Sequence, residues 1–130
     1  MDQELMLRAS FLEQQAKEIE ASLELVTRQV TELEQFSDHL SFFQKSKENQ
    51  MLAPLGKGIY LKTSYESKKL FVEVGSGVVV QKTPEETQEI IEAQLKRLKE
   101  IRLQLSEQLQ IYTHHLDKTL HDIEQQQPSS

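Results

Sequence analysis

The chain has 130 residues, no cysteine, no tryptophan and a net charge of −6. The lack of cysteine excludes disulfide bonds, thiol catalysis and cysteine-ligated zinc. The length fits one domain, and the acidic balance disfavours nucleic acid as a partner because phosphate binding needs clustered positive charge.

The N-terminus and the apolar runs predict a soluble, cytoplasmic protein. Met1-Asp2-Gln3-Glu4 is acidic and lacks the basic-then-apolar pattern of a signal peptide. No run of large apolar residues is long enough to span a bilayer. We therefore expect no membrane partner.

Residues 1–50 are predicted to form a long coiled-coil helix. They contain neither glycine nor proline, and apolar residues recur at a spacing of seven in two series. The d series is Leu5, Leu12, Ile19, Val26, Leu33 and Leu40, and the a series is Ala9, Ala16, Leu23, Val30 and Ser37. Only Ser37 is polar, so the pattern indicates a helix that packs along its length on another helix.

Residues 51–83 change period and contain all four glycines. Short β-like runs at 51–55 and 59–63 flank Gly56-Lys57-Gly58, and the run at 70–74 alternates apolar and other residues before a second run at 78–81. We interpret the segment as two β-hairpins. Its lysines are expected to keep the short strands soluble; they include Lys62, Lys68 and Lys69.

Gly75-Ser76-Gly77 follows a strand-like run and could instead be a phosphate-binding loop. A dinucleotide-binding fingerprint needs a third glycine where this chain has Val80, and the Gly-Lys-Ser/Thr of a P-loop is absent. A strand also separates these glycines from the next helix, whereas phosphate loops place glycines at the helix N-terminus. The pattern favours a hairpin turn, and we expect no cofactor.

Residues 84–126 are predicted to form a second coiled-coil helix. Thr83, Pro84 and Glu86 fit the N-cap, N1 and N3 positions of a capping box. The d series is Ile91, Leu98, Leu105, Tyr112 and Thr119, and the a series is Leu95, Arg102, Leu109, Leu116 and Ile123. Arg102 and Thr119 interrupt the apolar seam, and residues 127–130 are predicted to be a disordered tail.

The three segments predict a mainly α-helical protein, in which two helices form a long antiparallel coiled coil with the two hairpins inserted at its base. The hairpin segment of 33 residues is too short to sustain a core alone, since an isolated core becomes difficult below about 40 residues. Its strands also leave open edges. We therefore expect the hairpins to pair with hairpins of other subunits.

Several apolar residues lie off the predicted seam. They are Met6, Leu7 and Phe11 on the first helix and Ile101, Leu103, Ile111 and Leu120 on the second. Either they form a surface that binds a nonpolar partner, or the seam is broad. Phe36, Phe42, Phe43 and Ile90 are expected to pack under the hairpins.

Two motifs in the hairpin segment, MLAPLGKGIYL at 51–61 and LFVEVGSGVVVQKTPEE at 70–86, resemble the alpha-type subunit of prefoldin. The resemblance is close over about 30 residues and extends to the helices through length and heptad character. The segment at 63–67 departs from the family pattern because it lacks a glycine where many members turn.

The resemblance implies a hexameric, ATP-independent chaperone of two alpha-type and four beta-type subunits. The hairpins would form an intersubunit β-barrel, and the coiled-coil tips would hold unfolded proteins for delivery to a group II chaperonin. The implied client-binding residues are Leu5, Met6, Leu7, Phe11, Leu116, Leu120 and Ile123. The implied assembly residues are Leu55, Ile59, Leu70, Val72, Val74 and Val79.

Catalytic and metal-binding readings have little support in the sequence. His114, His115 and His121 lack the His-Glu-x-x-His spacing, so a solvated helix face is favoured over a metal site. No nucleophile lies near a base and an orienting group in sequence, and we expect no enzyme. A coiled-coil scaffold without client binding is the alternative function. Removing residues 1–11 and 117–130 should abolish aggregation suppression only in a chaperone.

Overall fold

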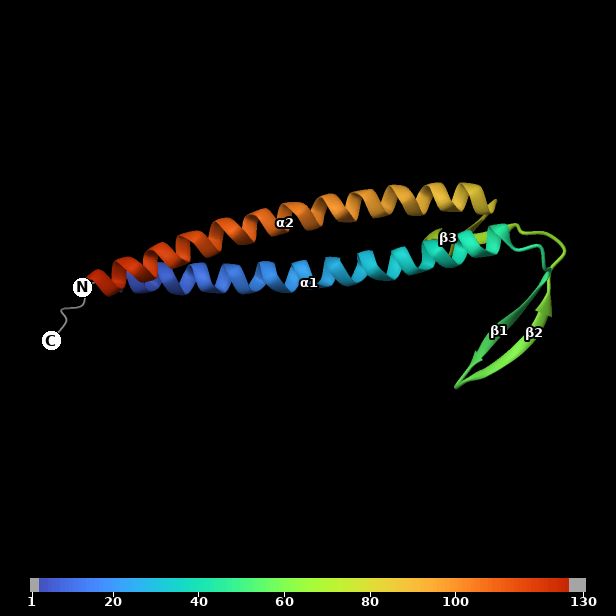
Figure 1. Cartoon of the computed structure of the whole chain (residues 1–130), viewed down its shortest axis with the longest axis horizontal. Helices are drawn as coiled ribbons and strands as arrows, with labels where there is room; N and C mark the ends of the chain where they lie inside the picture. Colours follow the sequence, from blue (N-terminus) through green and yellow to red (C-terminus); the bar gives the residue numbers. More distant parts are fainter. Residues whose placement is uncertain (1–2, 127–130) are drawn as a thin grey trace. The chain divides into compact units, whose positions relative to one another are not determined.

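The computed structural model describes residues 3–126 as two long helices separated by four strands (Figure 1). The elements, in chain order, are α1 (Gln3–Lys45), β1 (Gln50–Gly56), β2 (Ile59–Ser64), β3 (Leu70–Gly75), β4 (Val78–Lys82) and α2 (Pro84–Gln126). β1 pairs with β2 and β3 with β4, each pair antiparallel and each a separate two-stranded sheet. The predicted order of helix, two hairpins and helix is confirmed. The predicted tail at 127–130 lies outside the described residues.

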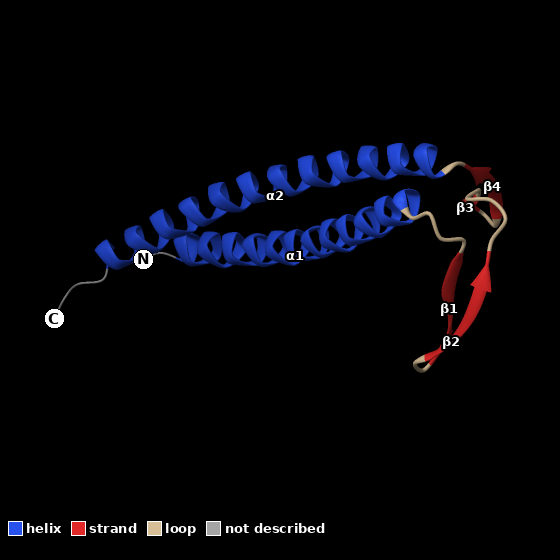
Figure 2. Ribbon diagram, turned by 45° about the vertical axis from the view of Figure 1, so that its right-hand side comes forward, coloured by secondary structure: helices blue, strands red, loops and turns tan. Residues whose placement is uncertain are grey.

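The chain divides into two compact units, one formed by residues 1–32 with 96–130 and the other by residues 33–95. In the described part of the first unit, the helices run antiparallel and side by side (Figures 1 and 2). Ala9, Leu12 and Ala16 are buried there, and Val30 is completely buried. None of the helices within residues 3–126 contains an apolar stretch of the length that a bilayer crossing requires.

The heptad seam predicted from the sequence is confirmed along both helices. Every predicted a and d residue, including Arg102 and Thr119, is buried or half-buried. Thr119 is tolerated in the seam because its hydroxyl donates to the carbonyl of His115 at 2.8 Å, within its own helix. In the second unit one polar pair joins the seam, in which Gln88 Nε2 donates to Ser37 Oγ at 2.6 Å.

Both hairpins turn in the same way. Lys57 and Gly58 have φ angles of 52° and 78°, and Ser76 and Gly77 have φ angles of 51° and 76°. Two consecutive positive φ angles are typical of the type I′ turn, whose twist suits a two-residue hairpin loop. The hairpin-turn interpretation of Gly75-Ser76-Gly77 is therefore confirmed, and these residues do not lead into a helix.

The capping box at the start of α2 is also confirmed. The backbone N–H of Thr83 donates to Glu86 Oε1 at 3.0 Å, and the backbone N–H of Glu86 donates to Thr83 Oγ1 at 3.1 Å. These two bonds satisfy N–H groups that a helix start leaves without an intrahelical partner. The backbone hydrogen bond from Thr83 lowers the pKa of Glu86 below its usual value of 4.5, with further lowering by the Thr83 side chain and by Lys82.

We expect Glu86→Gln to remove part of the acid sensitivity of this helix start. A carboxylate whose pKa is lower in the folded state adds stability above its unfolded pKa, and this stability disappears as the pH falls through the folded pKa. Thermal unfolding between pH 7 and pH 3 measures the effect. Glu85→Gln is the matched control, because it removes a neighbouring carboxylate and leaves both bonds of the box. Equal pH dependence in the two variants would contradict the prediction.

Candidate protein-binding surfaces

The β1–β2 hairpin displays apolar side chains on both faces. Its register pairs Ala53 with Leu61 and Pro54 with Tyr60, and these two pairs lie on opposite faces. Six large apolar side chains are between 50% and 68% exposed: Met51, Leu52, Leu55, Ile59, Tyr60 and Leu61. An isolated two-stranded hairpin is marginally stable in water at best, so this hairpin needs a covering partner.

The β3–β4 hairpin differs between its two faces. Leu70 and Val72 lie half-buried on one face with their cross-strand partners Lys82 and Val80. The other face exposes Phe71 to 73% and Val79 to 56%. The six residues predicted to mediate assembly thus fall into two groups: Leu70 and Val72 are half-buried within the chain, and Leu55, Ile59, Val74 and Val79 are exposed.

Lys68 connects the hairpin segment to the end of α1. Its ammonium group donates to the carbonyl oxygens of Phe43 at 2.9 Å and Gln44 at 3.1 Å, and also to that of Ser46. It lies 5.4 Å from the ring centroid of Phe43. The expectation that Lys68 serves to keep strands soluble is therefore wrong. The side chain is half-buried because it satisfies carbonyls that the helix end leaves without partners.

The same contacts account for a shorter first helix than the sequence predicts. The prediction extends the helix through residue 50, whereas α1 ends at Lys45 and Gln50 already belongs to β1. Near this end, the N–H of Tyr65 donates to the carbonyl of Asn49 at 2.8 Å, and the rings of Tyr65 and Phe43 lie 5.4 Å apart. These contacts hold residues 46–49 against the connection between the hairpins, despite the absence of glycine at 63–67.

We expect Lys68→Met to destabilise this junction by about 2 kcal/mol, because hydrogen bonds from a charged donor contribute about 1.5–3 kcal/mol and methionine keeps most of the side-chain volume. Denaturant unfolding measures the loss, and amide hydrogen exchange locates it near residues 46–49. Lys69→Met is the matched control, because Lys69 is the exposed neighbouring lysine. Equal stability of the two variants would show that the hydrogen bonds from Lys68 contribute nothing to the stability of the junction.

The predicted client-binding residues separate into exposed and seam positions. Met6, Leu7 and Phe11 are 58%, 71% and 58% exposed, and Leu120 is 45% exposed. Met6 and Leu7 line a shallow pocket of about 410 Å³ with Gln3. The other three predicted residues are half-buried in the seam: Leu5, Leu116 and Ile123. The exposure of Met6, Leu7 and Phe11 argues against a broad seam as the reason for these apolar residues.

The expected packing of four residues under the hairpins is correct only in part. Phe43 is half-buried against Tyr65 and Lys68, and Ile90 is half-buried. Phe36 and Phe42 are 49% and 76% exposed, so the expected packing is wrong for these two residues. Leu25 is a further exposed apolar residue of α1, which was not predicted to lie off the seam although it falls between seam positions Leu23 and Val26.

All three histidines of α2 are exposed, and the rings of His114 and His115 lie 5.9 Å apart. Within residues 3–126, no three His, Cys, Asp or Glu side chains come together in a group able to hold a metal ion.

The sequence of this chain matches a known protein family and is similar to two known members of it. The sequence model of the prefoldin family, described as prefoldin subunit, matches residues 12–129. Prefoldin subunit alpha 2 of Thermococcus kodakarensis is 29% identical over 86 residues, which cover 65% of this chain and 61% of that protein. Prefoldin subunit alpha of Methanosphaera stadtmanae is 22% identical over 90 residues, which cover 69% of this chain and 65% of that protein. The chain thus spans less than two thirds of each relative.

A solved structure shares the fold. A chain from the cryo-EM structure of filamentous PFD of Methanocaldococcus jannaschii superimposes with a TM-score of 0.74. The alignment covers 88% of this chain and 97% of that chain at 20% sequence identity.

Proposed function

Because this chain belongs to the prefoldin family, we propose that it is the alpha-type subunit of a hexameric, ATP-independent chaperone that holds unfolded proteins. The observation that carries the proposal is the group of exposed apolar side chains at Met6, Leu7 and Phe11, beside an otherwise complete heptad seam. Exposed apolar groups that a fold does not use for its own packing mark interaction sites. A site for unfolded protein needs nonpolar contacts without a fixed shape, which methionine and leucine side chains supply.

The hairpins supply the assembly surface in this proposal. Two copies of the chain would join four beta-type subunits, with strands from neighbouring subunits closing into an intersubunit β-barrel. The open strand edges and the exposed apolar residues of β1–β2 support this arrangement, because pairing removes both from water. Leu55, Ile59, Val74 and Val79 would become buried between subunits, and Leu70 and Val72 would support them from within the chain.

The clients would be non-native polypeptides, and the receiver would be a cytoplasmic group II chaperonin. Exposed residues Met6, Leu7, Phe11 and Leu120 would contact the client first. Leu5, Leu116 and Ile123 lie in the seam beside them and would contribute when the helix ends separate. The activity is one of binding and release without a reaction, so no cofactor is involved.

Aggregation suppression tests the chaperone function directly. A chemically unfolded model protein is diluted into buffer with the assembled complex, and light scattering is followed without ATP. We expect the scattering to fall as the complex approaches equimolar amounts with the client. Unchanged scattering would favour the alternative function, a coiled-coil scaffold without client binding.

A further inference from the structure

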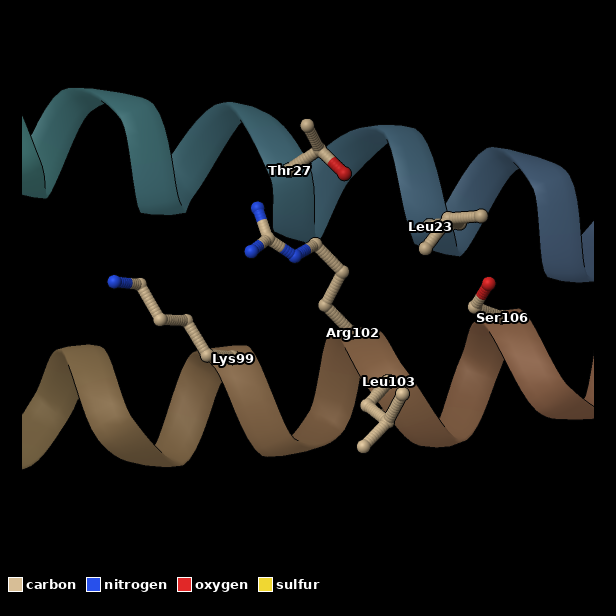
Figure 3. A pocket seen from close by; sticks show the side chains of 6 residues that line it. All are labelled: Leu23, Thr27, Lys99, Arg102, Leu103 and Ser106. Carbon is tan, nitrogen blue, oxygen red and sulfur yellow. The ribbon is translucent and has the colours of Figure 1, made fainter.

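A second pocket lies between the helices of the first unit, away from the exposed apolar cluster. Its volume is about 500 Å³, and it is lined by Leu23, Thr27, Lys99, Arg102, Leu103 and Ser106. In Figure 3 the Arg102 side chain extends from α2 toward α1 and ends beside Thr27, while Leu23 of α1 lies above Ser106 of α2. The pocket forms where the long, charged side chain of Arg102 replaces an apolar a residue of the seam.

The polar groups of this pocket can all donate hydrogen bonds, and two of them are cations. The guanidinium of Arg102 offers five N–H donors, the ammonium of Lys99 offers three, and the hydroxyls of Thr27 and Ser106 offer one each. No carboxylate lines the pocket. In the part of the chain that the structure describes, the ion pairs involve Lys17 and Arg28, and neither Lys99 nor Arg102 forms one. Two cations without anions in an acidic chain point to an anionic ligand.

The apolar part of the pocket indicates what the anion is attached to. Leu23 is half-buried, and Leu103 is 61% exposed beside Arg102. A ligand that satisfies both parts of the lining carries a carboxylate next to a branched aliphatic group. An acidic residue beside a leucine in an extended polypeptide has this chemistry, and Arg binds carboxylates with two parallel hydrogen bonds.

The heptad register places this pocket on the same flank of the helix pair as Met6, which belongs to the exposed apolar cluster of Met6, Leu7 and Phe11. Met6 and Leu120 occupy e positions, as do Thr27, Lys99 and Ser106, so all five lie along the same flank of the helix pair. Seventeen residues separate Met6 from Leu23, which is about 25 Å along a helix and about eight residues of extended chain. The intervening e positions of α1 are Glu13 and Glu20, so neither of them offers a cation to an acidic residue of the ligand.

We propose that the Arg102–Lys99 pocket binds acidic residues of unfolded clients whose apolar residues are held about eight positions away by Met6 and Leu120. The inference rests on the proposed chaperone function and adds a sequence preference to it. A client with an isolated acid next to a leucine, spaced from a second apolar segment, is held more tightly than a neutral one.

Two model peptides and the assembled complex test this inference. Both peptides are unstructured and carry an apolar segment followed, about eight residues later, by Leu-Glu-Leu or by Leu-Gln-Leu. Fluorescence anisotropy at low salt measures the dissociation constants. We expect the Glu peptide to bind roughly tenfold tighter, as for a charge-assisted hydrogen bond, and salt to reduce the difference. Equal affinities would overturn the inference.

Arg102→Leu separates a binding role from a structural one. The variant restores an apolar seam residue, so we expect a higher melting temperature together with loss of the preference for the Glu peptide. Arg97→Leu is the matched control, because Arg97 is an exposed arginine of the same helix outside the pocket, and it should keep the preference. A preference that persists in Arg102→Leu would overturn the proposal.

The remaining outcomes distinguish a failure of the pocket inference from a failure of the proposed chaperone function. If wild-type complex binds the Gln peptide and suppresses aggregation without any preference for the Glu peptide, the pocket inference fails and the chaperone function stands. If neither peptide binds, the chaperone function fails as well. If octanoate displaces the Glu peptide and binds as tightly, the site takes small organic anions and the assignment to clients is overturned.

Discussion

Val79→Asp is expected to prevent this chain from assembling with its partner subunits. Val79 pairs with Glu73 across the β3–β4 hairpin and is 56% exposed in the single chain, so the substitution removes little buried contact within the chain, although it places two carboxylates opposite each other. In the proposed β-barrel the same side chain is buried between subunits. Burying an unpaired carboxylate costs several kcal/mol, enough to reduce association by more than a hundredfold. Val74→Asp should behave alike, since Val74 is 57% exposed.

Size-exclusion chromatography with light scattering measures the assembly. Val79→Thr is the matched control, because threonine keeps the β-branched shape and introduces no charge, and we expect it to assemble. Circular dichroism should show the same helix content in all variants. An unchanged oligomeric mass for both aspartate variants would contradict a barrel built from these strands.

The triple variant Met6→Ser, Leu7→Ser and Phe11→Ser is expected to assemble normally and to lose most of its aggregation suppression. The three side chains lie outside the heptad seam and on a different element from the hairpins, so neither the coiled coil nor the assembly surface depends on them. Burying one such side chain against a client contributes about 1.5–3 kcal/mol. Removing three should therefore weaken client binding by at least tenfold.

Leu25→Ser is the matched control for this variant. Leu25 is an apolar residue of the same helix, 51% exposed, and lies far from residues 6–11 along α1. We expect Leu25→Ser to suppress aggregation as well as the wild type does. If the triple variant still protects the client, or if Leu25→Ser is equally impaired, client binding does not reside in the Met6–Phe11 cluster.

The helices, the turns and the capping box could be predicted because their causes are local in sequence. A spacing of seven residues assigns Leu12 and Val30 to the d and a series of α1 and Ile91 to the d series of α2, without knowledge of the rest of the fold. The positive φ angles of the Ser76-Gly77 turn and the reciprocal bonds of Thr83 and Glu86 likewise involve neighbours only. Such features depend on residues at most about two helical turns apart.

The end of α1 could not be predicted because its cause is distant in sequence. Lys68 binds the carbonyls of Phe43 and Gln44, which lie 25 and 24 positions before it in the sequence. No periodicity in the sequence predicts such a contact. The sequence around Gln44 continues to favour a helix. Which aromatic residue faces this junction depends on the same contact, so Phe43 and Phe42 differ in exposure although they are adjacent.

The site was predictable in its apolar part and not in its charged part. Met6, Leu7 and Phe11 stand out because they are large, apolar and off the seam. Arg102 is visible in the sequence only as an interruption of the heptad. Arg102 lies in one pocket with Thr27 and Leu23 because of the register between the two antiparallel helices. The heptad spacing within each helix does not define that register.

Native mass spectrometry of the complex that co-purifies with this chain from its natural source shows whether the proposed hexamer forms. We expect a hexamer with two copies of this chain and four copies of a beta-type coiled-coil partner. A monomer, a dimer of this chain alone, or a complex with unrelated large proteins would contradict it and favour the scaffold function.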